Sequence, residues 1–573
     1  MHKLSNPELF ELHFSATIKA NWEANVPVAQ QTIGRKRQWI KWVAGGVVLA
    51  LVITAAVVDL ALHRAEPFLR AHIVSYLEDQ FHSHVELDSF HVSLVNGMWA
   101  EGKGLRIWPP SLVQGIAVPQ GQGEPLIRLD EFRFHAPLYY RPGQPIHVST
   151  IQLKGLDIHM PPKSHFGHTA VAFGNPRPAG GLLSFRVETI DCIAAKLVME
   201  TSKPDKLPMT FAIAHLHLTY IATGGAMNFD AELTNPRPVG AIHTKGSFGP
   251  WQMADPGESP LSGDYTFDHA DLAIFHGIAG TLNSTGHYQG TLRNLTVDGR
   301  ANVPDFQLTH FDSPMPLMTR FHAYVDGTNG DTHLAPVEAI LGHAHFSAQG
   351  QIVRILAPDP GAPPHSIGHD IALSVNMNRA PIEDFMQLVS RSKAPLLTGA
   401  VTAKTSLHIQ PGPAQIHERI KLDGHFQLDQ ARFSSDKIQS RIAELSLRGQ
   451  GHPNDVKTAA ADSVLSQMQG NFQLAGGVLS LPALTYTVPG ATILLKGTYT
   501  VDGGALSFAG VAKMDAPVSK IVGGWKGFLL KPADRFFQKN GSGTEVPIHI
   551  EGTREAPKFG IDFDRLKPHS SEN

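Results

Sequence analysis

From residue 85 onward, short segments in which apolar and polar residues alternate follow one another along most of the chain. The first segment runs from Val85 to Leu94, with one extra residue at Asp88–Ser89. Alternation at period two is typical of a strand with one apolar face, and the extra residue predicts a β-bulge. Similar alternation recurs at residues 146–148, 151–153, 156–160, 213–218 and 548–550. The sequence therefore predicts a mainly β fold built on a long sheet.

Two short patterns also recur, and a fixed spacing of glycine and aromatic residues indicates one supersecondary unit used repeatedly. The first pattern, Gly-x-aromatic-x-apolar, begins at Gly263, Gly424, Gly470 and Gly497, with a weaker copy at Gly286. The second, apolar-x-Gly-x4-Pro-x-Phe-x-apolar, occupies 297–308 and 550–561. Its glycine fits a bend and its proline fits a strand entry or a sheet edge. The alternative is that both patterns are ordinary hairpin sequences, which also predicts a long antiparallel sheet.

The composition agrees with many short strands and excludes several functions. Gly and Pro number 53 and 41, about one residue in six, and both residues punctuate strands. Charged residues make up 17% of the chain, below the roughly 25% of soluble domains. The net charge of -3 gives no general basic face for nucleic-acid phosphates. The single cysteine, Cys192, excludes an intramolecular disulfide, a zinc ribbon and an iron–sulfur site.

One apolar segment predicts a membrane anchor. Residues 42–58 carry no charge, and with its flanks the segment 39–62 reaches the roughly 20 residues that a transmembrane helix needs. Trp42, Val47, Leu51 and Val58 represent this expected anchor. Cations at positions 35, 36, 37 and 41 precede it, so the positive-inside rule predicts a cytoplasmic N-terminus and an exported remainder. A cleaved signal peptide and a buried core helix are the alternatives.

These features divide the chain into five expected parts. Residues 1–38 form a cytoplasmic tail, for which disorder is one interpretation, and 39–62 form the transmembrane helix. An amphipathic juxtamembrane helix is expected at 63–82, a β-rich region at 83–565 and a polar tail at 566–573. Within the β-rich region, apolar residues at helical spacing predict two short helices, one after Pro381 and one after Pro517.

No catalytic constellation is recognisable, so we expect a protein that is not an enzyme. The chain has no Gly-x-Ser-x-Gly elbow, phosphate-binding loop or His-Glu-x-x-His helix; a hydrolase with a triad from distant positions is the remaining enzymatic alternative. Histidine is frequent, with 31 residues, and pairs such as His215 and His217 share one strand face. Because these pairs lack a nearby carboxylate or cysteine in the sequence, we expect no metal and no cofactor. A response of the histidines to acid pH is a further hypothesis.

Apolar strand faces can be shielded from water by two arrangements. They pack together in a closed core, or they line a groove that an apolar ligand fills. Alternation alone does not distinguish these arrangements. In the second arrangement Ile146, Val148, Ile151 and Leu153 are the candidates to face acyl chains, because each methylene that leaves water gains about 0.8 kcal/mol.

The order of these features resembles the AsmA-like family of bacterial envelope proteins, which is related to the bridge-like lipid-transfer proteins. Besides the basic flank and the anchor, the matching segments are 76–90, 146–160, 235–251, 380–385 and 546–554, followed by Phe559. These segments are distributed over most of the chain from about residue 38 onward. The resemblance implies an N-terminal transmembrane helix in the bacterial inner membrane, then a long, curved, mostly antiparallel β-sheet groove in the periplasm with a few short amphipathic helices.

The resemblance also implies a role in cell-envelope maintenance. A phospholipid or another acyl-chain ligand would be bound or conducted along the groove toward the outer membrane, with other envelope proteins as partners. The family has no agreed catalytic residues, so none is carried over, and the tail at residues 1–34 departs from the family pattern. The alternative is a scaffold or assembly factor that binds outer-membrane proteins through its sheet edges, because an exposed edge is a template for strand addition.

Overall fold

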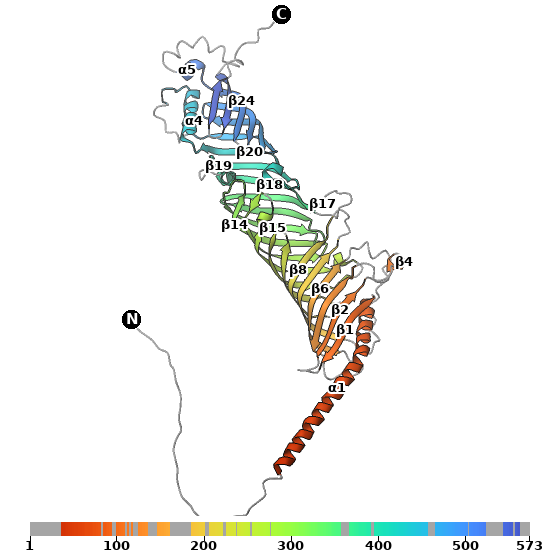
Figure 1. Ribbon diagram of the computed structural model, residues 1–573. Helices are drawn as coiled ribbons and strands as arrows, with labels where there is room; N and C mark the ends of the chain where they lie inside the picture. Colours follow the sequence, from red (N-terminus) through yellow and green to blue (C-terminus); the bar gives the residue numbers. More distant parts are fainter. Residues whose placement is uncertain are drawn as a thin grey trace, which may run out of the picture. The chain divides into compact units, whose positions relative to one another are not determined.

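Strands dominate the structure, a computed structural model (Figure 1), and this confirms the predicted mainly β fold. The chain divides into two units, Met1–Leu62 and His63–Asn573. The residues that the structure describes are 36–81, 84–93, 99–108, 112–113, 116–117, 124–135, 146–160, 185–200, 206–221, 225–236, 238–252, 255–275, 277–356, 366–390, 395–455, 464–501, 504–522, 543–553 and 556–561. The predicted polar tail at 566–573 and most of the predicted cytoplasmic tail lie outside them.

The first described element is helix α1 (Lys36–Phe81), which includes both the predicted anchor segment and the predicted juxtamembrane helix. The side chains of Val47 and Leu51 are 55% and 65% exposed. The side chains of Trp42 and Val58 lie outside the described residues. Among the residues that the structure describes, no helix combines the length and the apolar character that a bilayer crossing requires.

The remaining helices are short. They are α2 (Ile382–Leu388), α3 (Ile416–Arg419), α4 (Asp436–Gly449), α5 (Val518–Val522) and the 3-10 turns η2 (Pro256–Glu258) and η3 (Leu272–Ile274). The predicted helix after Pro381 is therefore confirmed as α2. The predicted helix after Pro517 is confirmed over α5, and its continuation from Gly523 lies outside the described residues.

Strands occupy most of the described chain. The N-terminal strands are β1 (Val85–Ser93), β2 (Trp99–Ile107), β3 (Leu112–Val113), β4 (Ile116–Ala117), β5 (Ile127–His135), β6 (Ile146–Met160), β7 (Phe185–Met199), β8 (Met209–Thr219), β9 (Met227–Pro236) and β10 (Val239–Phe248). The middle strands are β11 (Pro260–Asp271), β12 (Ile278–Ala279), β13 (Thr281–Thr291), β14 (Asn294–Leu308), β15 (Met315–Val325), β16 (Thr332–Leu341), β17 (Ala344–Leu356) and β18 (Ser366–Pro381). The C-terminal strands are β19 (Leu397–Ile409), β20 (Ile420–Phe433), β21 (Gln467–Ala475), β22 (Val478–Val488), β23 (Ala491–Thr500), β24 (Ala505–Met514), β25 (Thr544–Thr553) and β26 (Pro557–Ile561).

Among the described residues, 24 of these strands form one sheet, which is curved into a half-barrel. Neighbours in the chain are neighbours in the sheet, from β1 and β2 through β5, β6 and onward to β26. All pairs are antiparallel except β6 and β7, which run parallel. The short strand β12 pairs with β14, and β3 pairs with β4 outside the sheet. Antiparallel neighbours are what short connections between consecutive strands produce, so the expectation of a long, curved, mostly antiparallel sheet is confirmed.

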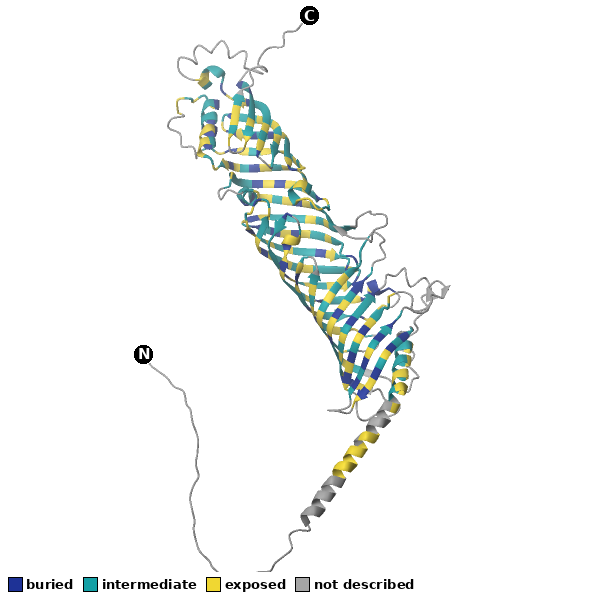
Figure 2. Cartoon of the chain, in the orientation of Figure 1, coloured by how far each residue is buried: buried dark blue, intermediate teal, exposed yellow. Residues whose placement is uncertain are grey.

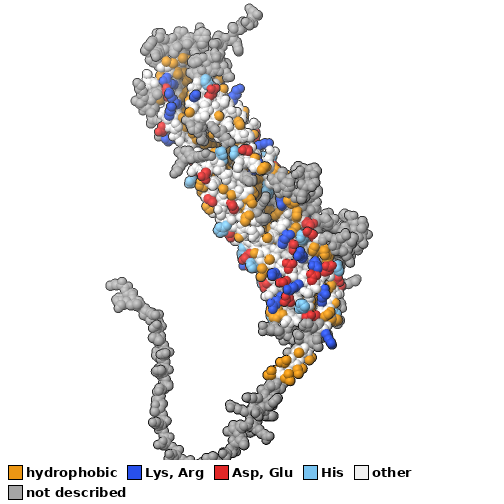
Figure 3. Space-filling view, viewed as in Figure 1, with side chains coloured by type: hydrophobic (Ala, Val, Ile, Leu, Met, Phe, Trp, Pro, Cys, Tyr) orange, Lys and Arg blue, Asp and Glu red, His pale blue; other side chains and the backbone are white. Residues whose placement is uncertain are grey.

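The sheet has an apolar face and a polar face. Burial alternates along the strands (Figure 2), as in β21, where Met468, Phe472 and Leu474 are half-buried and the glutamines between them are exposed. Side chains of successive strand residues point to opposite faces, so this alternation separates the two surfaces. Charged side chains gather over the N-terminal strands in the view of Figure 3.

The predicted change of phase in β1 is confirmed, but it is not a bulge. Leu87 and Phe90 are both buried although they are three residues apart. The register with β2 nevertheless runs through this point without a shift, so the prediction of an extra, unpaired residue is wrong. Instead Gly104 of β2, against which the Asp88 carboxylate lies, has a φ of 68°. Because a left-handed residue rotates the backbone, β1 and β2 exchange faces together at this position.

The second sequence pattern does not correspond to one repeated unit. Residues 297–308 lie within the single strand β14, whose register with β15 shifts between Val303 and Phe306. Residues 550–561 instead span two strands, β25 and β26, and the turn between them. The expectation of a common supersecondary unit is therefore wrong for this pattern, because a Gly–Pro spacing suits both a bulged strand and a hairpin.

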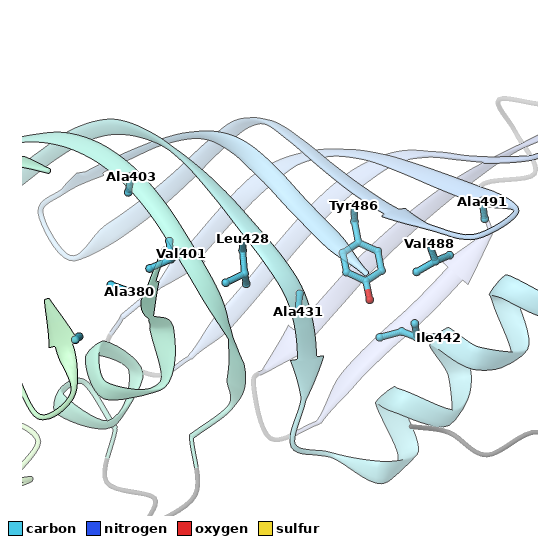
Figure 4. Packing of buried hydrophobic residues seen from close by; sticks show 10 residues of the cluster. Ala380, Val401, Ala403, Leu428, Ala431, Ile442, Tyr486, Val488 and Ala491 are labelled. Carbon is cyan, nitrogen blue, oxygen red and sulfur yellow. The ribbon is translucent and has the colours of Figure 1, made fainter. Parts of the chain in front are cut away.

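Near the C-terminal end, helices cover the apolar face. Figure 4 shows strands arching over Leu428 and Tyr486, with Ile442 of α4 on the same side. Helix α4 begins after Ser435, whose Oγ accepts a hydrogen bond from the Ile438 N–H at 3.4 Å, as an N-cap does. Phe385 of α2 packs against Phe346 of β17 at a ring distance of 5.7 Å. These short helices close a local core of buried side chains.

The free edge of β1 is covered by side chains of α1. The Glu66 and Glu78 carboxylates accept hydrogen bonds from the Val92 and Val85 N–H groups at 3.2 and 3.3 Å. The Arg70 guanidinium donates to the Leu87 carbonyl. Backbone groups at a sheet edge otherwise remain available for pairing with another chain, so α1 satisfies part of this edge.

Candidate functional site

One continuous row of residues on the apolar face crosses the sheet from end to end. Each member is paired in register with the next, one residue from every strand between β1 and β26 except β3, β4 and β12. The row, here called the apolar row, contains Val92, Ala100, Phe134, Ile151, Ile190, Leu218, Phe229, Gly246, Gly263, Tyr288, Val297, Ala323, Leu334, Gly350, Leu373, Leu407, Leu422, Leu474, Leu479, Tyr499, Leu506, Gly552 and Pro557. No member carries a charge or an amide side chain.

The burial of the apolar row distinguishes it from the core of a closed sandwich. None of its residues is exposed, and most are half-buried, including Leu373, Leu407 and Leu422. Residues inside a core between two sheets are fully buried. A half-buried apolar row is what a curved sheet produces when neighbouring side chains shield one another and, among the described residues, no second sheet covers them.

The first sequence pattern explains how the aromatic rings of this face are accommodated. Glycine and aromatic residues of adjacent strands face each other reciprocally: Gly263 is paired with Tyr288, and Tyr265 with Gly286. Two other strands repeat the arrangement, in which Gly424 faces Phe472 and Phe426 faces Gly470. A Cβ added to Gly286 would lie 2.8 Å from Tyr265 Cε1, and one added to Gly263 would lie 2.8 Å from Tyr288 Oη, so each tyrosine occupies the space that a side chain of the opposite glycine would need. The prediction of a reused unit is confirmed for these copies.

Hydroxyl groups on the apolar face are paired with each other. Thr244 Oγ1 lies 2.6 Å from Tyr288 Oη, and Tyr265 Oη lies 3.1 Å from Ser284 Oγ. Burial raises the pKa of both tyrosines above the ordinary phenol value. These phenols therefore stay neutral at physiological pH, and the face presents no charge at this point.

Two parts of the apolar face are closed. At one, Leu428, Tyr486 and Val488 pack beneath α4. At the other, Met160, Met199 and Leu292 form a second buried cluster. Outside these clusters the apolar row is half-buried from Ile151 onward, except at Gly263 and Ala323, whereas Val92, Ala100 and Phe134 at its N-terminal end are buried. An apolar ligand would therefore meet the row from β6 onward.

The predicted acyl-chain residues all lie on β6 but do not share one environment. Ile151 belongs to the apolar row, and Leu153 lies two residues along the same strand; both are half-buried. Val148 is 1% exposed and therefore lies within a filled part of the structure. Ile146 begins the strand, and its side chain lies outside the described residues. The row that extends from Ile151 to the other strands was not identified from the sequence, because register pairing is not visible there.

A row of charged residues runs directly beside the apolar row, on the opposite face. From β1 to β15 it contains His91, Glu101, Arg133, Gln152, Asp191, His217, Asp230, Lys245, Asp264, His287, Asp298 and His322. Basic and acidic residues alternate along this charged row, except at Gln152. Opposite charges directly across two strands stabilise their pairing.

In the charged row, histidines contact carboxylates of neighbouring strands, which are distant from them in the sequence. His217 Nδ1 lies 2.5 Å from Asp191 Oδ1, and His322 Nδ1 lies 2.7 Å from Asp298 Oδ1. The Lys245 ammonium lies 2.8 Å from Asp230 Oδ2 and lowers the pKa of the Asp230 carboxyl. A hydrogen bond with His243 lowers the same pKa further. The polar face is therefore held by ion pairs across strands, although single apolar side chains such as Ile193 and Tyr324 are exposed beside them.

The described residues show no constellation for covalent or metal chemistry. Burial raises the pKa of the Cys192 thiol to about 11, so it is protonated at neutral pH and a poor nucleophile. No three His, Cys, Asp or Glu side chains of the described ranges are arranged to hold a metal ion. Comparison with known protein families, with curated proteins and with solved structures finds no match. The arrangement of the two faces is thus the main functional feature of the site.

Proposed function

We propose that this chain binds phospholipids, or other acyl-chain ligands, along the apolar row and conducts them across the sheet. The observation that carries the proposal is the row itself, which crosses the sheet from β1 to β26 without a charge or an amide. An acyl chain on this row leaves water, and each buried methylene gains about 0.8 kcal/mol. Because the gain is similar at every position, a ligand could move from strand to strand without crossing a large barrier.

The single sheet and its polar face also support this proposal over a closed sandwich core. A closed sandwich needs a second sheet over the apolar face, and the described strands form one sheet of 24 strands beside the two-stranded sheet of β3 and β4. The charged row prevents stacking on the other side, because burying those ion pairs would cost more than their attraction returns. One apolar surface therefore remains available to a ligand.

The proposed location is the bacterial inner membrane, with the N-terminus in the cytoplasm and the sheet in the periplasm. The uncharged segment 42–58 and the cations before it support this orientation. The resemblance to the AsmA-like family supports a role in envelope maintenance. In this role the protein would pass lipid between membranes without catalysis.

Site-specific photocrosslinking tests the proposal. A photoreactive residue is placed at Leu407 of the apolar row and, as a matched control, at the adjacent Ser406, which lies on the polar face. We expect lipid adducts by mass spectrometry at Leu407 and not at Ser406. If lipid is conducted along the row, Leu218 and Leu506 also give lipid adducts.

Two results would contradict lipid binding on this face. One is equal labelling of lipid at Leu407 and Ser406, because it would show nonspecific contact with detergent or membrane. The other is recovery of protein adducts alone, which would favour the assembly-factor alternative. That alternative stays a prediction that requires an accessible sheet edge, and at β1 the side chains of Glu66, Arg70 and Glu78 already occupy edge groups.

A further inference from the structure

Two arginines on the polar face are placed directly opposite each other without a counter-charge in contact. Arg300 of β14 is paired in register with Arg320 of β15. Like charges directly across two strands destabilise the pairing, because their Cβ atoms are only about 5 Å apart. Within the described part of the chain, neither guanidinium forms a hydrogen bond or an ion pair. Glu338 lies opposite Arg320 in β16, yet no ion pair joins them.

A second opposed arginine pair in the same sheet shows how the chain neutralises such a contact. Arg106 of β2 is paired in register with Arg128 of β5. Arg106 lies 3.2 Å from Glu86 and 2.6 Å from Asp88, and Arg128 lies 3.7 Å from Asp130. The Glu86 and Asp88 hydrogen bonds raise the pKa of Arg106. The chain therefore supplies anions in contact with one arginine pair, whereas at the other pair the nearest register partner, Glu338, forms no ion pair with Arg320.

The uncompensated pair lies in a hollow of about 880 Å³. The hollow extends over two neighbouring register rows that cross β13 to β18, so it is formed by the sheet surface itself. One row contributes Thr285, Arg300, Arg320, Glu338, Ser347 and Asn376. The other contributes Asn283, Asn302, Met318, Ile340 and His345. Amides and hydroxyls therefore line the same hollow as the two guanidinium groups, together with the Glu338 carboxylate and the apolar Met318 and Ile340, and the amides and hydroxyls can donate further hydrogen bonds.

We propose that this hollow binds a phosphate-bearing ligand, with the phosphate between Arg300 and Arg320. A guanidinium presents a planar set of donors that matches two oxygens of a phosphate, and such charge-assisted hydrogen bonds are among the stronger ones. The bound phosphate replaces the anions that Glu86, Asp88 and Asp130 provide at the other arginine pair. The site is on the opposite face from the apolar row, so it is independent of the acyl-chain surface.

The ligand has two possible sources with the same chemistry, and the experiment uses a probe for each. The full chain is titrated with glycerol 3-phosphate as a soluble phosphate ester and, separately, with phosphatidylglycerol vesicles as a lipid headgroup. We expect Arg300→Gln and Arg320→Gln to weaken binding of the effective probe by about tenfold or more, which is the usual effect of losing charge-assisted hydrogen bonds. Arg128→Gln is the matched control, since it removes the same charge from the other opposed pair.

The Arg320→Lys variant distinguishes a specific phosphate site from simple attraction by positive charge. This variant keeps the positive charge but loses the planar donor set, so we expect it to bind nearly as weakly as Arg320→Gln. Thermal unfolding with and without the probe gives a second readout, because a ligand that binds the native state raises the melting temperature of the wild type and of Arg128→Gln only. Equal binding by all variants, wild-type affinity in Arg320→Lys, or no binding of either probe would each overturn the proposal. None of these results depends on the crosslinking at Leu407.

Discussion

Because a glycine faces an aromatic ring on the neighbouring strand, we predict that Gly→Ala lowers stability when the ring is present and raises it when the ring is removed. Gly102 of β2 lies between Phe90 of β1 and Phe132 of β5, with which it is paired in register. The Phe90 and Phe132 rings are 6.5 Å apart. A Cβ on Gly102 would lie 2.2 Å from Phe132 Cζ, which no contact allows. Gly102→Ala must therefore displace the Phe132 ring.

The magnitude follows from the packing. Phe132 is 8% exposed, so displacing its ring by overpacking is expected to cost about 1–3 kcal/mol. Phe132→Ala alone is expected to cost about 3–5 kcal/mol because it leaves a cavity. In the Phe132→Ala background, however, the added methyl no longer meets the Phe132 ring, and replacing glycine in a strand is expected to stabilise by roughly 0.5–1 kcal/mol. The same substitution should thus destabilise the wild type and stabilise the variant.

Hydrogen exchange of the β2 and β5 amides measures these effects locally, which suits a large sheet that need not unfold in one step. The four proteins of the double-mutant cycle are compared, with Lys103→Ala as the control. Lys103 is the neighbouring residue on the polar face, half exposed at 51%, and its substitution is expected to change stability by less than about 0.5 kcal/mol. If Gly102→Ala lowers protection equally with and without the Phe132 ring, the steric explanation of the glycine–aromatic pairs is wrong.

Three other substitutions test separate parts of the structure. Leu428, 1% exposed beneath α4, should lose about 3–5 kcal/mol in equilibrium unfolding when changed to alanine. Ser435→Ala removes the N-cap of α4 and should cost about 1 kcal/mol, measured as faster amide exchange in that helix. The pKa of Cys192, about 11 against an ordinary 9.0, means that the folded state favours the protonated thiol. This contribution to stability is present below pH 9 and lost as the pH rises through 11, so Cys192→Ala should flatten the alkaline stability profile; an unchanged profile would contradict it.

Much of the fold could be predicted because it depends on local pattern. Period-two alternation identifies strands without knowledge of their partners, and a proline followed by apolar residues at helical spacing identifies α2. Helix α4 was not predicted, although Ser435 and the apolar residues Ile438, Ile442 and Leu445 carry the information for a capped amphipathic helix. The phase change at Asp88 was found, but its mechanism was not, because the partner Gly104 is needed to explain it.

The candidate site could be predicted only in part, since it depends on register. The alternation at residues 151–153 predicts Ile151 and Leu153 as acyl-chain residues from one strand alone. Nothing in the sequence connects Ile151 with Leu218 or Leu407, which belong to other strands of the apolar row. The same limit applies to the charged row, whose acidic and basic members lie on different strands. It also applies to the parallel pairing of β6 with β7, because alternation is the same in parallel and antiparallel strands.

The two rows together determine which surface a ligand can use. Residues of the apolar row and the charged row are sequence neighbours, as Phe229 and Asp230 are in β9 or Gly263 and Asp264 in β11. In the strands from β1 to β15, except β6, a slip of one residue would therefore place a charge on the apolar face and a residue of the apolar row among the ion pairs. The ion pairs are exposed and individually weak, so their main effect is on register rather than on stability. By fixing the register from β1 to β15, the charged row keeps this part of the apolar row continuous, and continuity is the property on which the proposed movement of an acyl chain along the sheet depends.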